Sequence, residues 1–95
     1  MDTKYVYEVR DISNDEIYYP LGIFLNLDDA KKQILEFEKD QSIADRDDDY
    51  EVISIYRRSI DWIRDGTEVF SVRRERNYQE ETGNYYWEVV EQNEF

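Results

Sequence analysis

The sequence predicts a small α+β fold, an antiparallel sheet of about four strands with one helix packed on one face, in the order β-α-β-β-β. Short segments in which apolar and polar residues alternate recur along the chain, and this alternation is typical of half-buried strands. The segment 27–39 instead carries apolar residues at helical spacing. The segments after it are joined by short connections, which favour antiparallel neighbours.

The first strand is expected near the start of the chain. Its apolar residues alternate with charged ones, Tyr5, Tyr7 and Val9 against Lys4, Glu8 and Arg10. Asn14-Asp15 and Tyr19-Pro20 interrupt this pattern, and residues 21–24 form only a short apolar step before the helix.

The helix is the element with the strongest support. Asn26 stands directly before the periodic segment and can act as its N-cap. Acidic residues in the first turn and Lys39 in the last turn both favour the helix dipole. One face of the predicted helix is apolar, and it carries Leu27, Ala30, Ile34 and Phe37, with Leu35 beside it.

Three more strands are expected after the helix. The segment from Asp45 to Glu51 holds five acidic residues and one arginine, whose mutual repulsion predicts a solvated loop. Strand composition and turn residues then alternate to the end of the chain, with strands at Val52 to Tyr56, Glu68 to Arg74 and Tyr85 to Val90, and turns at Asp65-Gly66 and Thr82-Gly83-Asn84.

One short stretch resembles a known arrangement. Gly22-Ile23-Phe24 followed by Asn26-Leu27-Asp28-Asp29-Ala30 resembles the strand-to-helix entry of many small uncharacterised bacterial and phage domains. The resemblance covers about ten residues, consists mainly of N-cap chemistry, and implies local structure without any activity.

Length and composition limit the class of protein. With 95 residues, the chain is expected to form a single domain over residues 1–95. The net charge of −12 should repel bare nucleic acid and anionic membranes. There is no cysteine, which excludes disulfides and cysteine-ligated metals and fits a reducing compartment. No apolar run has the length of a signal or membrane segment, so the cytoplasm is the expected location.

The residue inventory argues against catalysis. His and Cys, the commonest general base and the strongest nucleophile, are both absent. No glycine-rich phosphate loop or nucleophile elbow is present, and the sequence predicts neither enzyme activity nor a cofactor. A pair of carboxylates that act as acid and base stays open as an alternative, because their separation depends on the fold.

The acidic loop imitates a calcium-binding loop only in part. Asp45, Asp47 and Asp49 match its first three ligand positions, but Tyr50 occupies the place that needs glycine and Tyr56 the place that needs a bidentate glutamate. We therefore interpret the loop as exposed acidic surface and expect no specific metal site, with a weak divalent-cation site at Asp47 to Asp49 as the alternative.

Arginines are concentrated in the second half of the chain. Six of them could form a phosphate-binding patch or could pair with glutamates across the sheet, and the second interpretation is favoured. The arginines are Arg57, Arg58, Arg64, Arg73, Arg74 and Arg76, and the glutamates are Glu68, Glu75, Glu88 and Glu91. Trp62, in a predicted loop between Ile60 and Ile63, is either an aromatic anchor for a partner or a cover for the core.

The acidic surplus suggests a binding function. Residues 1–51 carry a net charge of −9 and residues 52–95 a net charge of −3. For a compact chain spanning ~32 Å, a charge of −12 is about two-thirds of that on the same length of duplex DNA. We therefore expect a protein that binds a basic partner, plausibly a nucleic-acid-binding protein, as antirestriction and anti-CRISPR mimics do. The expected contact residues are Glu36, Asp40, Asp45, Asp47, Asp48, Asp49 and Glu51, with Trp62 as a candidate anchor. A structural accessory domain or a homodimer is the runner-up, and a carboxylate enzyme comes third.

Overall fold

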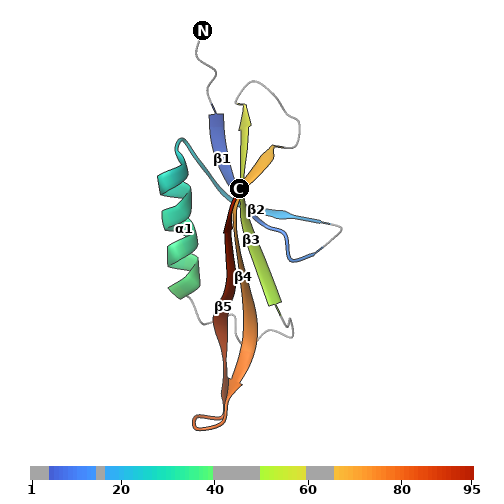
Figure 1. Ribbon diagram of the computed structural model, residues 1–95, viewed down its shortest axis with the longest axis vertical. Coiled ribbons are helices and arrows are strands. Elements are labelled where there is room, and N and C mark those ends of the chain that lie inside the picture. Colours follow the sequence, from blue (N-terminus) through green and yellow to red (C-terminus); the bar gives the residue numbers. More distant parts are fainter. Residues whose placement is uncertain (1–4, 15–16, 40–49, 60–65) are drawn as a thin grey trace.

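The described residues form one antiparallel sheet of five strands with a helix packed on one face (Figure 1). The computed structural model describes residues 5–14, 17–39, 50–59 and 66–95. The elements in chain order are β1 Tyr5–Asp11, β2 Tyr19–Phe24, α1 Leu27–Lys39, β3 Tyr50–Ser59, β4 Thr67–Gln79 and β5 Asn84–Glu94. The strands lie in the order β2-β1-β3-β4-β5, and every neighbouring pair is antiparallel. The predicted α+β class and the helix on one face are confirmed.

The predicted number of strands is wrong, because β2 forms a fifth strand before the helix. Its six residues include Pro20 and Gly22, which weaken a strand pattern in the sequence. β2 lies at the edge of the sheet and pairs only with β1, where a proline removes no hydrogen bond from an inner ladder. The register shift between Val9 and Arg10 accommodates one extra residue of β2.

The helix begins where the sequence predicts. The backbone amide of Asp29 donates to the Asn26 side-chain oxygen at 2.8 Å, and the Asn26 side-chain amide donates to an Asp29 carboxylate oxygen at 3.0 Å. The first bond gives the Asp29 amide a partner that it would otherwise lack at the start of a helix, and the second holds the Asn26 side chain in place. Ala30 and Ile34 are buried, whereas Leu35 is 53% exposed.

The hydrophobic core lies between the helix and the middle of the sheet. Its buried residues come from α1, β1, β3 and β4, and they are Val9, Ala30, Ile34, Ile53, Ile55, Phe70 and Val72. Partly buried residues extend it, among them Phe24, Leu27 and Phe37. The predicted apolar face of the helix is thus the face that contacts the sheet.

The sheet face without the helix is also partly buried, because charged and aromatic side chains cover one another there. Glu8 and Arg10 in β1 are 6% and 5% exposed and form an ion pair. The Arg10 guanidinium lies 4.3 Å from the centre of the Tyr18 ring and 4.2 Å from that of Tyr56. β1 is therefore buried on both faces at these residues, more than the half-buried strand that its alternation predicts.

The molecule is longer than a compact chain of its size. Its radius of gyration is 14.9 Å and its extents are 58 × 27 × 20 Å, whereas 95 residues in a compact fold would have a radius of ~12 Å. The cause is the long β4–β5 hairpin, which projects past the end of α1 (Figure 1). Within the described residues, no helix is long and apolar enough to cross a membrane.

Candidate protein-binding surface

Most of the acidic residues predicted to contact a partner lie outside the described residues. This holds for Asp40 and for the acidic loop at positions 45, 47, 48 and 49, and also for Trp62. Glu36, on α1, is described. Its side chain is 72% exposed, and one of its carboxylate oxygens lies 3.3 Å from the Lys39 ammonium nitrogen.

Glu51 belongs to the interior and not to an acidic surface loop. It lies in β3, and its side chain is only 2% exposed. The prediction that the solvated loop extends to Glu51 is wrong, because Glu51 pairs in register with Arg74 of β4 and its carboxylate accepts a hydrogen bond of 2.7 Å from that arginine. A buried arginine opposite makes this position favourable for a carboxylate.

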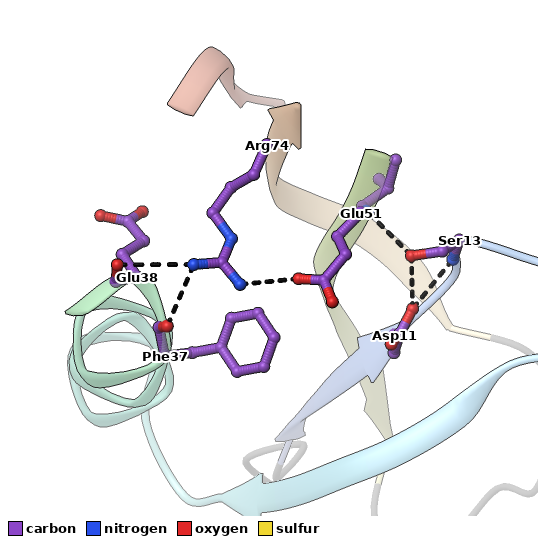
Figure 2. A network of polar contacts seen from close by, with 7 residues as sticks. Asp11, Ser13, Phe37, Glu38, Glu51 and Arg74 are labelled. Carbon is purple, nitrogen blue, oxygen red and sulfur yellow. Dashed lines mark hydrogen bonds and ion pairs between the residues drawn. The ribbon is translucent and has the colours of Figure 1, made fainter. Parts of the chain in front are cut away.

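Arg74 connects this ion pair to the end of the helix (Figure 2). Its side chain is 1% exposed, and one guanidinium nitrogen donates to the backbone carbonyls of Phe37 and Glu38 at 3.3 and 3.4 Å. These carbonyls belong to the last turn of α1, where a positive charge is favourable. The guanidinium also lies over the Phe37 ring, 4.5 Å from its centre. Arg74 thus joins β4, β3 and α1.

The Glu38 side chain beside this network has a shifted pKa. Burial raises the pKa of Glu38 above its ordinary value of 4.5, and the positive charge of Arg74 offsets part of that rise. The ion pair therefore influences the ionisation of a residue at the helix end.

A second polar network joins β1 to β3. The Ser13 hydroxyl donates to Asp11 at 2.6 Å and accepts from the backbone amide of Val52 at 2.9 Å (Figure 2). The hydroxyl of Tyr50 donates to the Ser13 carbonyl at 3.3 Å. These contacts fix the segment after β1 against the start of β3, so both networks visible in Figure 2 have a structural role.

The arginines of the later strands contact both carboxylates and aromatic rings. Arg58 of β3 pairs with Glu8 of β1 at 3.5 Å across the sheet, as Arg74 does with Glu51, whereas Arg73 and Glu75, 3.4 Å apart, both belong to β4. The predicted pairing with glutamate is therefore present, although Glu8 and Glu51 were not among the expected partners. Several guanidinium groups also stack on tyrosines, with Arg57 over Tyr5, Arg73 over Tyr50 and Arg76 over Tyr85. Arg64 lies outside the described residues.

The projecting hairpin carries an exposed aromatic and aliphatic surface, which we call the hairpin surface. Its five members are between 39% and 53% exposed, and they are Tyr78, Tyr85, Tyr86, Val89 and Val90. The Tyr78 and Tyr85 rings pack on each other across the two strands, with their centres 5.2 Å apart. Exposed carboxylates surround them, from Glu80, Glu81, Glu88 and Glu91. Aromatic side chains are enriched where proteins contact one another, and polar side chains form the rim of such contacts.

The turn of this hairpin is well defined. Gly83 has a φ of +71°, a conformation that favours glycine, and its amide donates to the Gln79 carbonyl at 2.9 Å. The predicted turn at Thr82-Gly83-Asn84 is therefore confirmed, and it holds the Tyr78–Tyr85 pair beside it.

Neither the search for metal-binding residues nor the comparison with known proteins indicates a function. Among the described residues, no group of three or more acidic side chains is arranged to hold a metal ion. Comparison of the chain with protein-family models, curated proteins and solved structures finds no match. The function must therefore be argued from the surface itself.

The hairpin surface was not predicted from the sequence. Tyr85, Trp87 and Val89 alternate as a buried face would, but only Trp87 is buried. Tyr85 lies near the turn of the hairpin, in the part that projects past the end of α1 (Figure 1). The sequence does contain a pattern that indicates exposed apolar residues here, because Tyr86 and Val90 alternate on the opposite face to Tyr85, Trp87 and Val89. These residues make both faces of the last strand apolar, and a single helix can cover only one.

Proposed function

We propose that this chain is a non-enzymatic module that binds a protein with a basic surface, and that the β4–β5 hairpin is its contact element. The observation that carries the proposal is the hairpin surface, in which exposed tyrosines and valines are surrounded by carboxylates. Apolar side chains on a projecting element bury area on contact, while the carboxylates favour a basic partner and speed association.

The charge of the buried residues supports this proposal. Arg10 and Arg74 are both buried against glutamates, so two of the 12 basic residues are withdrawn from the surface. Each pair removes one negative and one positive charge, so the exposed surface retains the whole net charge of −12. A surface this acidic attracts basic proteins and repels nucleic acid.

Mimicry of nucleic acid is the more specific form of the proposal. The observed length of the molecule makes mimicry less well supported, because 58 Å of duplex DNA would carry ~34 phosphate charges. A net charge of −12 is about a third of that density, and not the two-thirds expected for a compact chain. Mimicry therefore depends on a local concentration of charge, for which the acidic loop at positions 45–49 is the candidate.

The test is affinity capture with matched variants. The tagged full chain is incubated with a lysate of the cells that produce it, in parallel with a Tyr85→Ser/Tyr86→Ser variant and with a variant in which Asp47, Asp48 and Asp49 are changed to lysine. Both variants are first shown to be folded by circular dichroism. Capture is repeated at low and high salt and with competing DNA.

The outcomes separate the alternatives. A basic protein that the wild type captures and the tyrosine variant loses would support the hairpin as contact element. Loss in the lysine variant together with release by DNA would instead support mimicry through the acidic loop. Equal capture by all three chains would contradict both forms of the proposal.

A further inference from the structure

β5 is a long edge strand with an open outer side. It has 11 residues, all exposed except Trp87 and Asn93, and it pairs with β4 on one side only. No described strand lies along its other side. The opposite edge, β2, has only six residues, and Pro20 lowers its capacity to pair with another strand. The two edges are thus unequal, and β5 is the one on which an extended segment could form a ladder.

The hydrogen-bonding phase of β5 identifies which amides face outward. The Phe95 amide donates to the Val69 carbonyl at 3.1 Å, so this position faces β4. In an antiparallel pair, the backbone groups of successive residues point alternately toward and away from the neighbour. Between Glu91 and Glu94 the register is unbroken. The backbone groups of Gln92 and Glu94 therefore point away from β4, toward the open side.

The side chains of β5 favour a basic occupant. The strand contains Glu88, Glu91 and Glu94 and neither lysine nor arginine. Glu94 already contacts Lys31 at 2.6 Å. Glu88 and Glu91 accept hydrogen bonds from the neutral side chains of Asn77 and Asn93, so their negative charges remain for a basic partner. The Tyr85 ring already has the Arg76 guanidinium over it, whereas Tyr86, 39% exposed, can accept a cation over its ring.

The same charges disfavour a second copy of the chain. Two β5 strands paired about the point between Val89 and Val90 would place Glu88 of each copy opposite Glu91 of the other, and like charges directly opposite destabilise a strand pair. Each copy also carries a net charge of −12. A segment with lysine or arginine at alternate positions would place positive charges against the same carboxylates.

We propose that the outer edge of β5 binds an extended lysine- or arginine-containing protein segment, which adds to the sheet as a sixth strand. This proposal deepens the proposed function, because it gives the basic partner a binding mode. Main-chain hydrogen bonds to residues such as Gln92 would supply part of the affinity, and the carboxylates would select the charge of the partner.

The experiment uses two peptides and two matched variants of the full chain. The probe is a fluorescent nine-residue peptide of alternating lysine and valine, and its control has the same sequence with amides N-methylated along both edges. Gln92→Pro removes an outward amide and leaves the bonds to β4 in place, whereas Gln92→Ala keeps that amide. Binding is followed by fluorescence anisotropy.

The expected result is binding of the unmethylated peptide and a loss of about tenfold or more on N-methylation or in Gln92→Pro, with Gln92→Ala close to wild type. The methylated peptide tests the proposal even if Gln92→Pro proves unstable. Equal affinity for both peptides would overturn strand addition. No binding of either peptide, or a dimer by analytical ultracentrifugation that Gln92→Pro abolishes, would also overturn it.

Failure here is distinguishable from failure of the proposed function. If the peptides bind equally or not at all while affinity capture still depends on Tyr85 and Tyr86, then side chains alone make the contact and the proposed function stands. If capture is also unaffected by the tyrosines, the hairpin is not the contact element.

Discussion

The two halves of this sheet use similar residues for different purposes. In the half under the helix, β1 and β3 place Val9, Ile53 and Ile55 in a core in which each is at most 1% exposed. In the projecting half, β5 buries Trp87 and leaves its other apolar residues in solvent. The difference shows that folding accounts for these residues of β1 and β3, although β2 beside them also exposes Leu21 and Ile23 at 40% and 56%. The exposed residues of the second half call for another reason, and we propose that the reason is binding.

The largest expected effect concerns Arg74, which stands where the two halves meet. Arg74→Ala should lower the free energy of unfolding by about 3 to 5 kcal/mol, because it leaves the Glu51 carboxylate buried without its positive partner. Urea denaturation measures the change. Arg74→Met combined with Glu51→Leu is the control and should recover most of the stability. A loss below about 1 kcal/mol for Arg74→Ala would show that the pair does not hold the halves together.

A substitution at Ile34 tests whether α1 packs on the sheet through its predicted apolar face. Ile34→Ala should cost about 2 to 5 kcal/mol of unfolding free energy, because it leaves a cavity between α1 and the sheet. Leu35→Ala, on the neighbouring but exposed position, should stay within about 0.5 kcal/mol. Thermal denaturation of both variants measures the two losses of unfolding free energy. Equal losses for Ile34→Ala and Leu35→Ala would mean that the helix packs on the sheet through a different face.

The projecting half should tolerate truncation of its exposed rings. Tyr85→Ala removes the Tyr78 contact, so we expect a loss of only about 0.5 to 1.5 kcal/mol in unfolding free energy. Trp87→Ala, in the same strand but buried, should cost about 3 to 5 kcal/mol. If Tyr85→Ala were as damaging as Trp87→Ala, the hairpin surface would belong to the folding core and the comparison between the halves would fail.

The smallest effect is expected at Glu38. Because its pKa is raised in the folded state, the protein is more stable when Glu38 is protonated, and this stabilisation is lost as the pH rises from 4.5 through the folded pKa. Glu38→Gln should therefore slightly stabilise the protein at pH 7 relative to wild type. The two chains should converge in stability below pH 4.5. A variant that is less stable than wild type at pH 7 would show that attraction to Arg74 outweighs burial.

The sequence predicted the elements that depend on neighbours along the chain. The Asn26 cap, the buried pair Ala30 and Ile34, and the turn at Gly83 all follow from local spacing and backbone preference. β2 was missed because its pairing with β1 compensates for an unfavourable Pro20 and Gly22. Pairing between strands is a tertiary effect, and a single segment does not reveal it.

The candidate site depended even more on tertiary structure. Glu51 appears in the sequence as the last member of an acidic run, and only the register of β3 against β4 brings it to Arg74. Tyr85 alternates like a core residue, and only the projection of the hairpin past the end of α1 shows that it is exposed. The overall charge, in contrast, needs no fold, and the basic partner that it suggests stays a prediction.

The most direct test of the account is a backbone amide NMR titration of the isotope-labelled chain with the lysine–valine peptide. The account predicts shift changes concentrated on β5 and the end of β4, largest around Tyr85, Tyr86 and Gln92, with the amides of α1 nearly unchanged. Changes centred on α1 and the residues after it, with β5 unaffected, would contradict the claim that the projecting half of the sheet is the binding element.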